Sequence, residues 1–192
     1  MTQELTIIIF KYCWGLLLII AVAAQFVFGG KLKKKAGLMT NLIVATPYLI
    51  VFGWFSVREH FGTYQGHLMT QLAGLILIIL GICGYTVSIL FLRYNWAVSA
   101  AIKERHSLVN NGPYKYVRHP MYFFMILVIL GSGLLISNYL IILYTPIICI
   151  IYYWRAKKEE ELLKNEIPGY DTYVSKTKML LPSIFLNKGD RQ

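Results

Sequence analysis

The chain alternates between five long apolar runs and short polar segments. The first apolar run exceeds the roughly 20 residues that a helix needs to cross a bilayer. The fourth and fifth runs are short for a full span, which leaves helix tilt, local thinning of the bilayer or partial insertion open. We therefore expect an all-α integral membrane protein with about five transmembrane helices. The runs are, approximately, Leu5 to Phe28, Thr40 to Val57, Leu68 to Leu92, Met121 to Ile136 and Leu140 to Trp154.

The last two runs are separated only by Ser137, Asn138 and Tyr139. Such a short connection forces two neighbouring helices to run antiparallel, so we expect a C-terminal helical hairpin. Proline is tolerated in the first turn of a helix, and Pro120 therefore predicts that the fourth helix begins near His119. The unpaired N–H groups at that helix start are suited to an anionic group.

Composition and charge agree with this pattern. Hydrophobic residues make up 57% of the 192 residues and charged residues 15%, a balance typical of membrane proteins rather than soluble domains. The net charge of +10 gathers at the ends of the apolar runs, as membrane topology requires, so we do not expect a nucleic-acid partner. We expect one membrane domain over residues 1–192, with three helices in 1–92 and a catalytic half in 93–192.

The basic residues also predict the orientation. The loop after the second run holds only Arg58, whereas the loops after the first and third runs and the C-terminal tail hold all the others beyond the helix interiors. With five spans these regions share one side of the membrane, and an excess of Lys and Arg marks that side as cytoplasmic. They contain Lys31, Lys33, Lys34, Lys35, Arg93, Lys103, Arg105, Lys115, Arg118, Arg155, Lys157, Lys158, Lys164, Lys176, Lys178, Lys188 and Arg191.

Neither targeting nor cysteine chemistry changes this interpretation. The segment before the first run carries Glu4 and no basic residue, which is atypical of a signal peptide, so we expect a retained anchor. Cys13, Cys83 and Cys149 all lie inside apolar runs without a paired spacing. We expect buried thiols, with no disulfide framework and no metal site.

Three polar segments on the predicted cytoplasmic side concentrate the candidate chemistry. Arg155 and Glu159 are four residues apart on a helix and share a face, whereas Glu160 and Glu161 are expected to point elsewhere. The hairpin should bring His119 to the same mouth. On spacing alone, a salt-bridged, solvated helix end is the better explanation. A histidine, an arginine and a carboxylate at one membrane boundary nevertheless form a plausible site.

The segment between the third and fourth apolar runs contains the other candidate site residues. Asn95 to Arg105 is expected to form an amphipathic helix at the interface with Trp96 as its anchor, or a plain helical connector. The turn at Asn110 to Pro113 should fold Leu108 and Val109 back toward Tyr114.

These residues resemble the isoprenylcysteine carboxyl methyltransferase family. The pattern is His106-x-Leu108-Val109-x-x-Gly112-x-Tyr114, then Arg118-His119-Pro120-x-Tyr122, then Arg155-x-x-x-Glu159-Glu160-x-x-Leu163. It continues with Tyr170, Tyr173, Thr177 and Leu181-Pro182, so the resemblance covers about Asn95 to Pro182. One departure is the stretch Glu166 to Gly169, which is slightly shorter than its family counterpart.

The resemblance implies a membrane methyltransferase that uses S-adenosylmethionine and methylates the carboxylate of a prenylated or lipid-like acceptor. It implies an all-helical fold with a cytoplasmic cofactor site, and no Gly-rich loop typical of a Rossmann fold follows a strand here. By the same resemblance, Arg155 faces the acceptor and shares catalysis with Glu159. The implied cofactor contacts are His106, Ser107, Leu108, Val109, Tyr114, His119, Tyr122 and Glu159.

Elementary chemistry fits those roles. A carboxylate acceptor is already ionised at neutral pH, so it needs alignment and partial desolvation more than it needs a base. Arg155 can orient it through paired hydrogen bonds. Glu159 can bind polar groups of the cofactor and fix Arg155, while Leu108, Val109 and Tyr114 can cover the adenine.

Three alternatives stay open at this point. A phospholipid amine or a lipid-like hydroxyl could replace the carboxylate as acceptor. An NADPH-dependent sterol-reductase-like enzyme also carries an Arg-His-Pro-x-Tyr element, by analogy. A non-catalytic membrane scaffold or transporter subunit would need no cofactor. The sequence names neither the acceptor nor the oligomeric state.

Overall fold

The computed structural model describes residues 1–28, 32–35, 62–95, 101–103 and 107–181. The second apolar run, Thr40 to Val57, with its expected proline kink, lies outside these residues. The described elements are α1 (Gln3–Phe28), β1 (Leu32–Lys35), α3 (Leu68–Leu92), the 3₁₀ turn η1 (Arg93–Asn95), β2 (Ala101–Lys103), the 3₁₀ turn η2 (Gly112–Lys115), α4 (Pro120–Leu135), α5 (Tyr139–Glu166) and α6 (Tyr170–Lys176).

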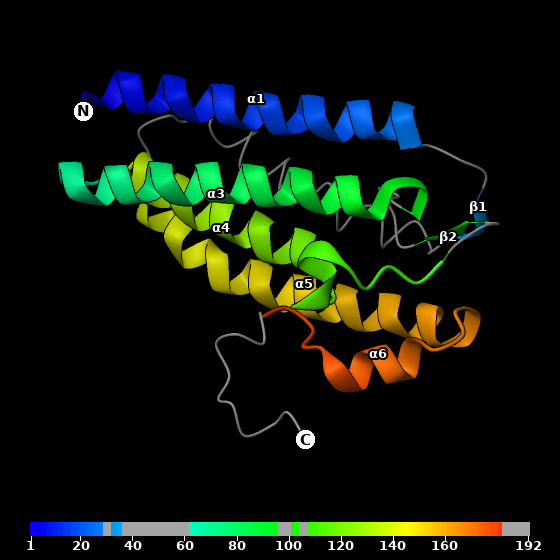
Figure 1. The fold of residues 1–192 in the computed structure, drawn as a ribbon. Coiled ribbons are helices and arrows are strands. Elements are labelled where there is room, and N and C mark those ends of the chain that lie inside the picture. The colour runs from blue at the N-terminus through cyan, green and yellow to red at the C-terminus, as the bar shows by residue number, and fades with distance from the viewer. Residues whose placement is uncertain (29–31, 36–61, 96–100, 104–106, 182–192) are drawn as a thin grey trace.

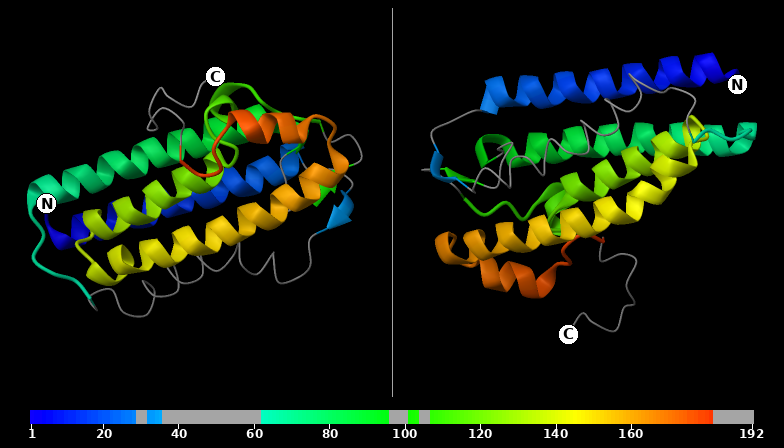
Figure 2. Two further views of the ribbon diagram at one scale, coloured as in Figure 1. Left: turned by 90° about the horizontal axis from the view of Figure 1, so that it is seen from below. Right: turned by 180° about the vertical axis from the view of Figure 1, so that it is seen from behind.

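The four long helices run roughly along one axis and form a bundle, with the short α6 beside the C-terminal part of α5 (Figures 1 and 2). At one end the chain start meets α3, because the Met1 amino group donates to Gln71 Oε1 at 3.1 Å. The α4–α5 turn lies at this end too, where Tyr64 N donates to Ser137 O at 2.8 Å. The strands, η2 and α6 lie toward the opposite end, so the polar motifs share one end of the bundle.

The tightest packing in the bundle joins α3 to α4 through glycines. A Cβ added to Gly131 would lie 2.7 Å from the carbonyl oxygen of Gly74, and one added to Gly81 would lie 2.5 Å from Val128 Cγ2. Small residues at such crossings let two helix backbones approach closely, which is how helices gain van der Waals contact within a bilayer. This contact fixes the position of α4, and with it the start of the hairpin.

A buried polar contact joins α1 to α4. Trp14 Nε1 donates to Ser132 Oγ at 3.0 Å, and Ser132 Oγ donates in turn to the Val128 carbonyl at 2.7 Å. Inside an apolar bundle an unpaired indole N–H would be costly, so this pairing favours one rotational setting of α1.

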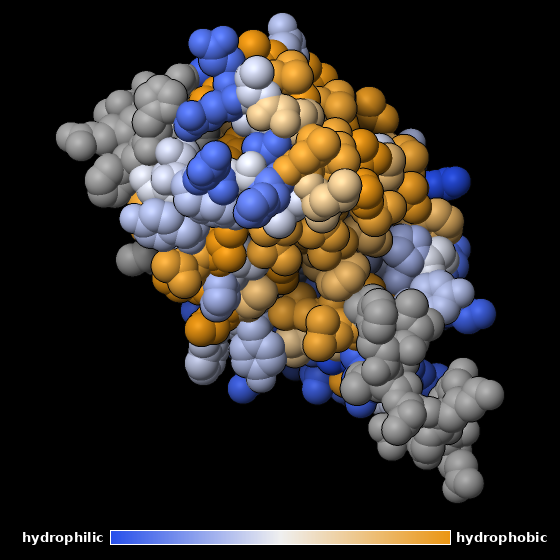
Figure 3. All heavy atoms as spheres, turned by 90° about the vertical axis from the view of Figure 1, so that its left-hand side faces the viewer, coloured by the Kyte–Doolittle hydropathy of each residue, from blue (hydrophilic) through white to orange (hydrophobic). Residues whose placement is uncertain are grey.

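Figure 3 views the bundle from the end at which α3 begins, and much of the face that it shows is apolar. Large hydrophobic side chains stay exposed on three long helices, among them Leu18, Phe26, Ile76, Leu143 and Ile150. An exposed apolar surface of this kind fits hydrocarbon rather than water. The protein is therefore an integral membrane protein built from several apolar helices.

Helices α1, α3 and α5 are long and apolar enough to cross a membrane, whereas α4 is not. With 16 residues, α4 is about 24 Å long, which is less than the roughly 30 Å hydrocarbon core. The expectation of a short fourth helix is thus confirmed. Helix α5 continues past the apolar run that ends at Trp154, for a total of 28 residues, which confirms that Arg155 and Glu159 lie on one helix. Its charged part, from Arg155 onward, extends beyond the apolar segment.

The expected helix over Asn95 to Arg105 is wrong where the structure describes it. Residues Ala101–Lys103 form strand β2, which pairs antiparallel with Leu32–Lys35, and Lys35 lies opposite Ala101. Arg93–Asn95 form a 3₁₀ turn. The basic segment after α1 supplies backbone partners across the chain, and such tertiary pairing overrides local helix propensity.

Candidate active site

The site begins where α4 begins. His119 is the residue that precedes the helix, and Pro120 occupies its first turn, which confirms the predicted start. Two backbone hydrogen bonds hold this point to the segment after α6: Arg118 N donates to Lys178 O at 2.9 Å and His119 N to Met179 O at 3.0 Å. The start of α4 is therefore fixed by residues some 60 positions later in the chain.

Glu160 lies beside Arg118 and His119 at the start of α4, contrary to the expectation that it points elsewhere. Arg118 binds its carboxylate with two hydrogen bonds, from Nε at 2.6 Å and from the terminal nitrogen at 3.3 Å. The same guanidinium also donates to the carbonyl oxygens of Val174 and Thr177. The side chains of Arg118 and Glu160 are each 8% exposed. Contacts from the start of α4 and from the segment that follows α6 therefore bury Glu160, whereas the side chain of the adjacent Glu159 is 29% exposed.

Glu160 is ionised within this arrangement. Burial by itself would raise the pKa of the Glu160 carboxyl, but hydrogen bonds from His119 and Arg118 outweigh burial and lower that pKa below its usual value. A buried guanidinium and a buried carboxylate thus neutralise each other at neutral pH.

His119 lies between two carboxylates. Its Nε2 is 3.1 Å from Glu160 Oε1, and its Nδ1 is 3.8 Å from Glu159 Oε2. The imidazole stacks on the ring of Tyr122, with centroids 5.4 Å apart, and Tyr122 stacks on Tyr152 at 5.0 Å. The stack sets the plane of the imidazole, and the hydrogen bond to Glu160 sets its rotation.

Tyr122 connects the two residues that share a face of α5. Arg155 Nε donates to Tyr122 Oη at 2.5 Å, and Tyr122 Oη donates to Glu159 Oε2 at 2.7 Å. The Arg155 guanidinium also lies 5.5 Å from the centre of the Tyr122 ring. Arg155 is 5% exposed. The hairpin thus brings His119, Tyr122, Arg155 and Glu159 together, as expected, and the connection between the last two runs through a phenol.

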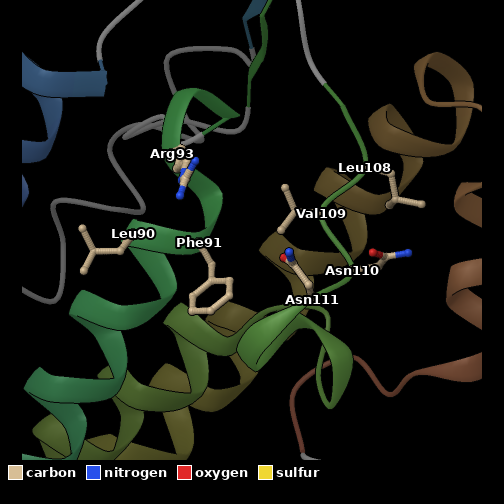
Figure 4. Close-up of a pocket in the computed structure, with 7 residues that line it drawn as sticks. All are labelled: Leu90, Phe91, Arg93, Leu108, Val109, Asn110 and Asn111. Carbon is tan, nitrogen blue, oxygen red and sulfur yellow. The ribbon is translucent and has the colours of Figure 1, made fainter.

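A cavity of about 420 Å³ opens between the end of α3 and the loop before η2. Phe91 and Asn111 face each other in it, with Val109 nearby (Figure 4). Leu108 also packs against the cluster of Ile167, Tyr170 and Tyr173, which ties the cavity wall to α6. The full lining consists of Leu90, Phe91, Arg93, Leu108, Val109, Asn110 and Asn111.

A sequence model of the isoprenylcysteine carboxyl methyltransferase family matches residues 72–165. The matched region runs from α3 to the charged end of α5 and contains the side chains Arg118, His119, Tyr122, Arg155, Glu159 and Glu160. Over residues 72–165, just under half of the chain, the protein is similar to this family. Comparison with curated proteins gives no match. The family uses S-adenosylmethionine and methylates the carboxyl group of isoprenylcysteine, so this protein is a membrane methyltransferase, and the reductase and scaffold alternatives are set aside.

The other residues that were predicted to contact the cofactor lie in different surroundings. Leu108 and Val109 line the cavity. Tyr114 is buried in η2, where its hydroxyl donates to Ser88 O at 3.4 Å and its carbonyl accepts from Tyr173 Oη at 2.6 Å. Burial, and then the charge of Glu159, raise the pKa of the Tyr114 phenol, so the hydroxyl stays protonated. His106 lies outside the described residues.

Ser107 is held by Asn95, the last residue of the 3₁₀ turn η1 that follows α3. Asn95 Nδ2 donates to Ser107 O at 2.8 Å, and Ser107 N donates to Asn95 Oδ1 at 3.3 Å. This reciprocal pair fixes the loop that carries Leu108 and Val109 into the cavity wall. Sequence reasoning assigned no role to Asn95, Arg118 or Glu160. The adjacent Glu159-Glu160 pair was the available signal, since two consecutive carboxylates can serve two different partners.

Proposed function

We propose that the methyltransferase binds S-adenosylmethionine against the cavity and the His119–Glu159 cluster, and that Arg155 receives the carboxylate of the methyl acceptor. The hydrogen-bonded series from Arg155 through Tyr122 to Glu159 carries this proposal, because it joins a cation suited to the acceptor with an anion suited to the cofactor.

The chemistry of the cavity supports the cofactor part. S-adenosylmethionine supplies a methyl group on a positively charged sulfonium, together with an adenosine and an amino-acid end. Phe91, Leu108 and Val109 offer apolar surface for a purine, while the amides of Asn110 and Asn111 can donate to or accept from polar groups. The volume of about 420 Å³ falls in the range of small-molecule sites. The Glu159 carboxylate favours a nearby cation.

The environment of Arg155 supports the acceptor part. A carboxylate attacks the methyl carbon in line and needs no proton removed, so the protein has to orient it and limit its hydration. Arg155 is almost fully buried yet lies at the end of the apolar part of α5. A guanidinium there can orient a carboxylate that reaches it from the membrane boundary.

The outer face of α5 supports a prenylated or other lipid-like acceptor. Ile150, Tyr153 and Trp154 are exposed within one and a half turns of the buried Arg155. An apolar tail could lie along this face while its carboxylate turns inward to Arg155. The basic residues at the same end, among them Lys157 and Lys176, favour a cytoplasmic position for the site.

Two measurements on detergent-purified protein test this function. The first is the Kd for S-adenosylmethionine in the wild type, in Glu159→Gln and in Glu161→Gln, which carries the same change on an exposed neighbour. We expect Glu159→Gln to weaken binding at least tenfold and Glu161→Gln to leave it unchanged. Equal affinity in all three proteins would contradict the assignment of Glu159.

The second measurement compares acceptors. Methyl transfer to a farnesylcysteine carboxylate, to a long-chain fatty acid and to a phospholipid amine is followed in the wild type and in Arg155→Lys. We expect carboxylate methylation only, with kcat/KM for the acceptor reduced roughly 100-fold in the variant, because Lys cannot form the paired hydrogen bonds. Transfer to the amine with no effect of Arg155→Lys would favour the phospholipid alternative.

A further inference from the structure

We propose that Glu160 is a positioning residue that selects the tautomer of His119 and thereby prepares the Nδ1 side of the imidazole to receive a hydrogen-bond donor from the cofactor. The inference rests on the proposed function in one respect, namely that His119 contacts S-adenosylmethionine. Its other part, the control of His119 by Glu160, concerns the protein alone.

The tautomer follows from the partners of the ring. An ionised carboxylate only accepts hydrogen bonds, so the 3.1 Å contact with Glu160 Oε1 requires a proton on His119 Nε2. Arg118 keeps Glu160 ionised by donating two hydrogen bonds to it. In the neutral form of the imidazole, a proton on Nε2 places the lone pair on Nδ1, on the side of Glu159. Glu160 thus decides which nitrogen of His119 accepts.

His119 Nδ1 is then a hydrogen-bond acceptor that lies beside a second acceptor, the Glu159 carboxylate. Nδ1 lies 3.8 Å from Glu159 Oε2, and a neutral Nδ1 cannot donate to that oxygen. Glu159 Oε2 already accepts from Tyr122 Oη and keeps further acceptor capacity. Two adjacent acceptors favour a ligand group with several protons. The chemical class that fits is an ammonium or a hydroxyl group, and S-adenosylmethionine has both.

The orientation of the His119 imidazole is restricted by its neighbours. The imidazole plane is within 4° of the Tyr122 ring, and His119 is 8% exposed. His119 N also donates to Met179 O, so the backbone before α4 is fixed. A half-turn of the ring would keep this plane but would remove Nε2 from Glu160, so the 3.1 Å contact selects the observed orientation. The protonation of the two nitrogens is then the remaining choice. Outer partners of a functional histidine act in this way in metal sites, where they fix the tautomer of the ligand.

Glu160 also has a structural role, and the two roles can be separated. Through Arg118 it connects α5 to the carbonyl oxygens of Val174 and Thr177, so its removal should loosen the C-terminal segment. A loss of packing would lower the melting temperature. The tautomer role should instead change the affinity for the cofactor, because it acts through His119 alone.

The test is a double-mutant cycle on the Kd for S-adenosylmethionine, using Glu160→Gln, His119→Gln and the double variant in detergent-purified full-length protein. Glutamine keeps the size of Glu160 but can present either an oxygen or an N–H group to His119. We expect each single variant to weaken binding roughly tenfold, the scale of one charge-assisted hydrogen bond, and the double variant to bind no more weakly than His119→Gln. Full additivity of the two losses would overturn the inference.

Nitrogen-15 NMR of protein labelled on histidine gives the readout that a structural role would not change. The His119 signals are assigned from their loss in His119→Gln. We expect a proton on Nε2 in the wild type and in the control Glu161→Gln, and a shift toward the Nδ1-protonated form in Glu160→Gln. A lower melting temperature in Glu160→Gln with unchanged tautomer and unchanged cofactor affinity would reduce Glu160 to a structural residue.

Failure of the proposed function would look different. If His119→Gln folds and binds S-adenosylmethionine as the wild type does, then the cofactor contact of His119 is wrong. The tautomer shift in Glu160→Gln would still establish that Glu160 controls His119. An unchanged tautomer in Glu160→Gln, with His119→Gln weakened in binding, would overturn the inference and leave the proposed function standing.

Discussion

At the scale of single residues, the site depends on how polar side chains are shared. Tyr122 Oη accepts from Arg155 and donates to Glu159, and Glu160 serves both Arg118 and His119. Glu160 is thus paired directly with Arg118, whereas Glu159 is linked to Arg155 through the Tyr122 hydroxyl. Such division keeps Arg155 and Arg118 in place although both are buried, since each has a partner that offsets the cost of desolvation.

The variant Tyr122→Phe tests the bridging phenol. It keeps the ring that stacks on His119 and Tyr152 but removes the hydroxyl between Arg155 and Glu159. We expect kcat/KM for methyl transfer to fall about 10- to 100-fold, because displaced reacting groups are costly, while the free energy of unfolding falls by only about 1–2 kcal/mol.

Initial rates at varied acceptor concentration give kcat/KM, and chemical denaturation gives the free energy of unfolding. Tyr116→Phe is the matched control, since Tyr116 is 47% exposed and lies close by in the chain. A Tyr122→Phe protein with wild-type kcat/KM would show that the hydroxyl has no part in aligning the reactants.

At the scale of elements, the hairpin of α4 and α5 positions the site, and α3 positions the hairpin. The start of α4 supplies Arg118, His119 and Tyr122, and the charged extension of α5 supplies Arg155, Glu159 and Glu160. A shift of α4 along α3 would therefore displace half of the cluster relative to the other half. The close approach of Gly74 and Gly131 resists that shift.

The variant Gly131→Ala tests this contact. A Cβ there would lie 2.7 Å from Gly74 O, so the helices must separate, and we expect a loss of about 1–3 kcal/mol in stability. For a protein of this size, the melting temperature should fall by several degrees. Gly15→Ala is the control, because a Cβ at Gly15 meets nothing within 4 Å.

The control variant should be neutral or slightly stabilising, since alanine has a higher helix propensity than glycine. Melting in detergent, followed by circular dichroism, measures both proteins. Equal melting temperatures for Gly131→Ala and the wild type would mean that the α3–α4 crossing tolerates separation.

At the scale of the whole molecule, the bundle has two chemically different ends. The chain start, the Gly62 to His67 segment and the α4–α5 turn meet at one end, and the site with its basic surroundings lies at the other (Figure 1). Exposed hydrophobic side chains of the long helices, among them Leu18, Ile76 and Ile150, lie between them. A methyltransferase of this shape can hold a polar cofactor at the water boundary while its acceptor stays in the lipid.

Orientation can be tested by cysteine labelling. In a protein whose native cysteines are replaced by alanine, Ser175→Cys and Tyr64→Cys place single thiols at exposed positions on opposite ends. We expect a membrane-impermeant maleimide added outside intact cells to label Tyr64→Cys alone, and Ser175→Cys to react only after the membrane is opened. The reverse pattern would place the site on the outer side.

The sequence by itself determined the long apolar helices and the shared face of Arg155 and Glu159, because both depend on local periodicity. The boundaries of Leu68–Leu92 and the start at Pro120 follow from apolar runs and from the chemistry of proline. The four-residue spacing puts Arg155 and Glu159 on one face whatever surrounds them. The short connection between the last two apolar runs predicts a hairpin, so His119, Arg155 and Glu159 could be expected at one end of it.

Tertiary structure alone decided which partners these side chains have. Glu160 was expected to face away from the site. Instead, α4 and the segment after α6 pack against it, and Glu160 is buried with Arg118 and His119. Ala101–Lys103 became a strand because Leu32–Lys35 offered backbone partners from a distant part of the chain. Helical periodicity fixes the direction of a side chain, but what covers that direction depends on packing between segments far apart in the sequence.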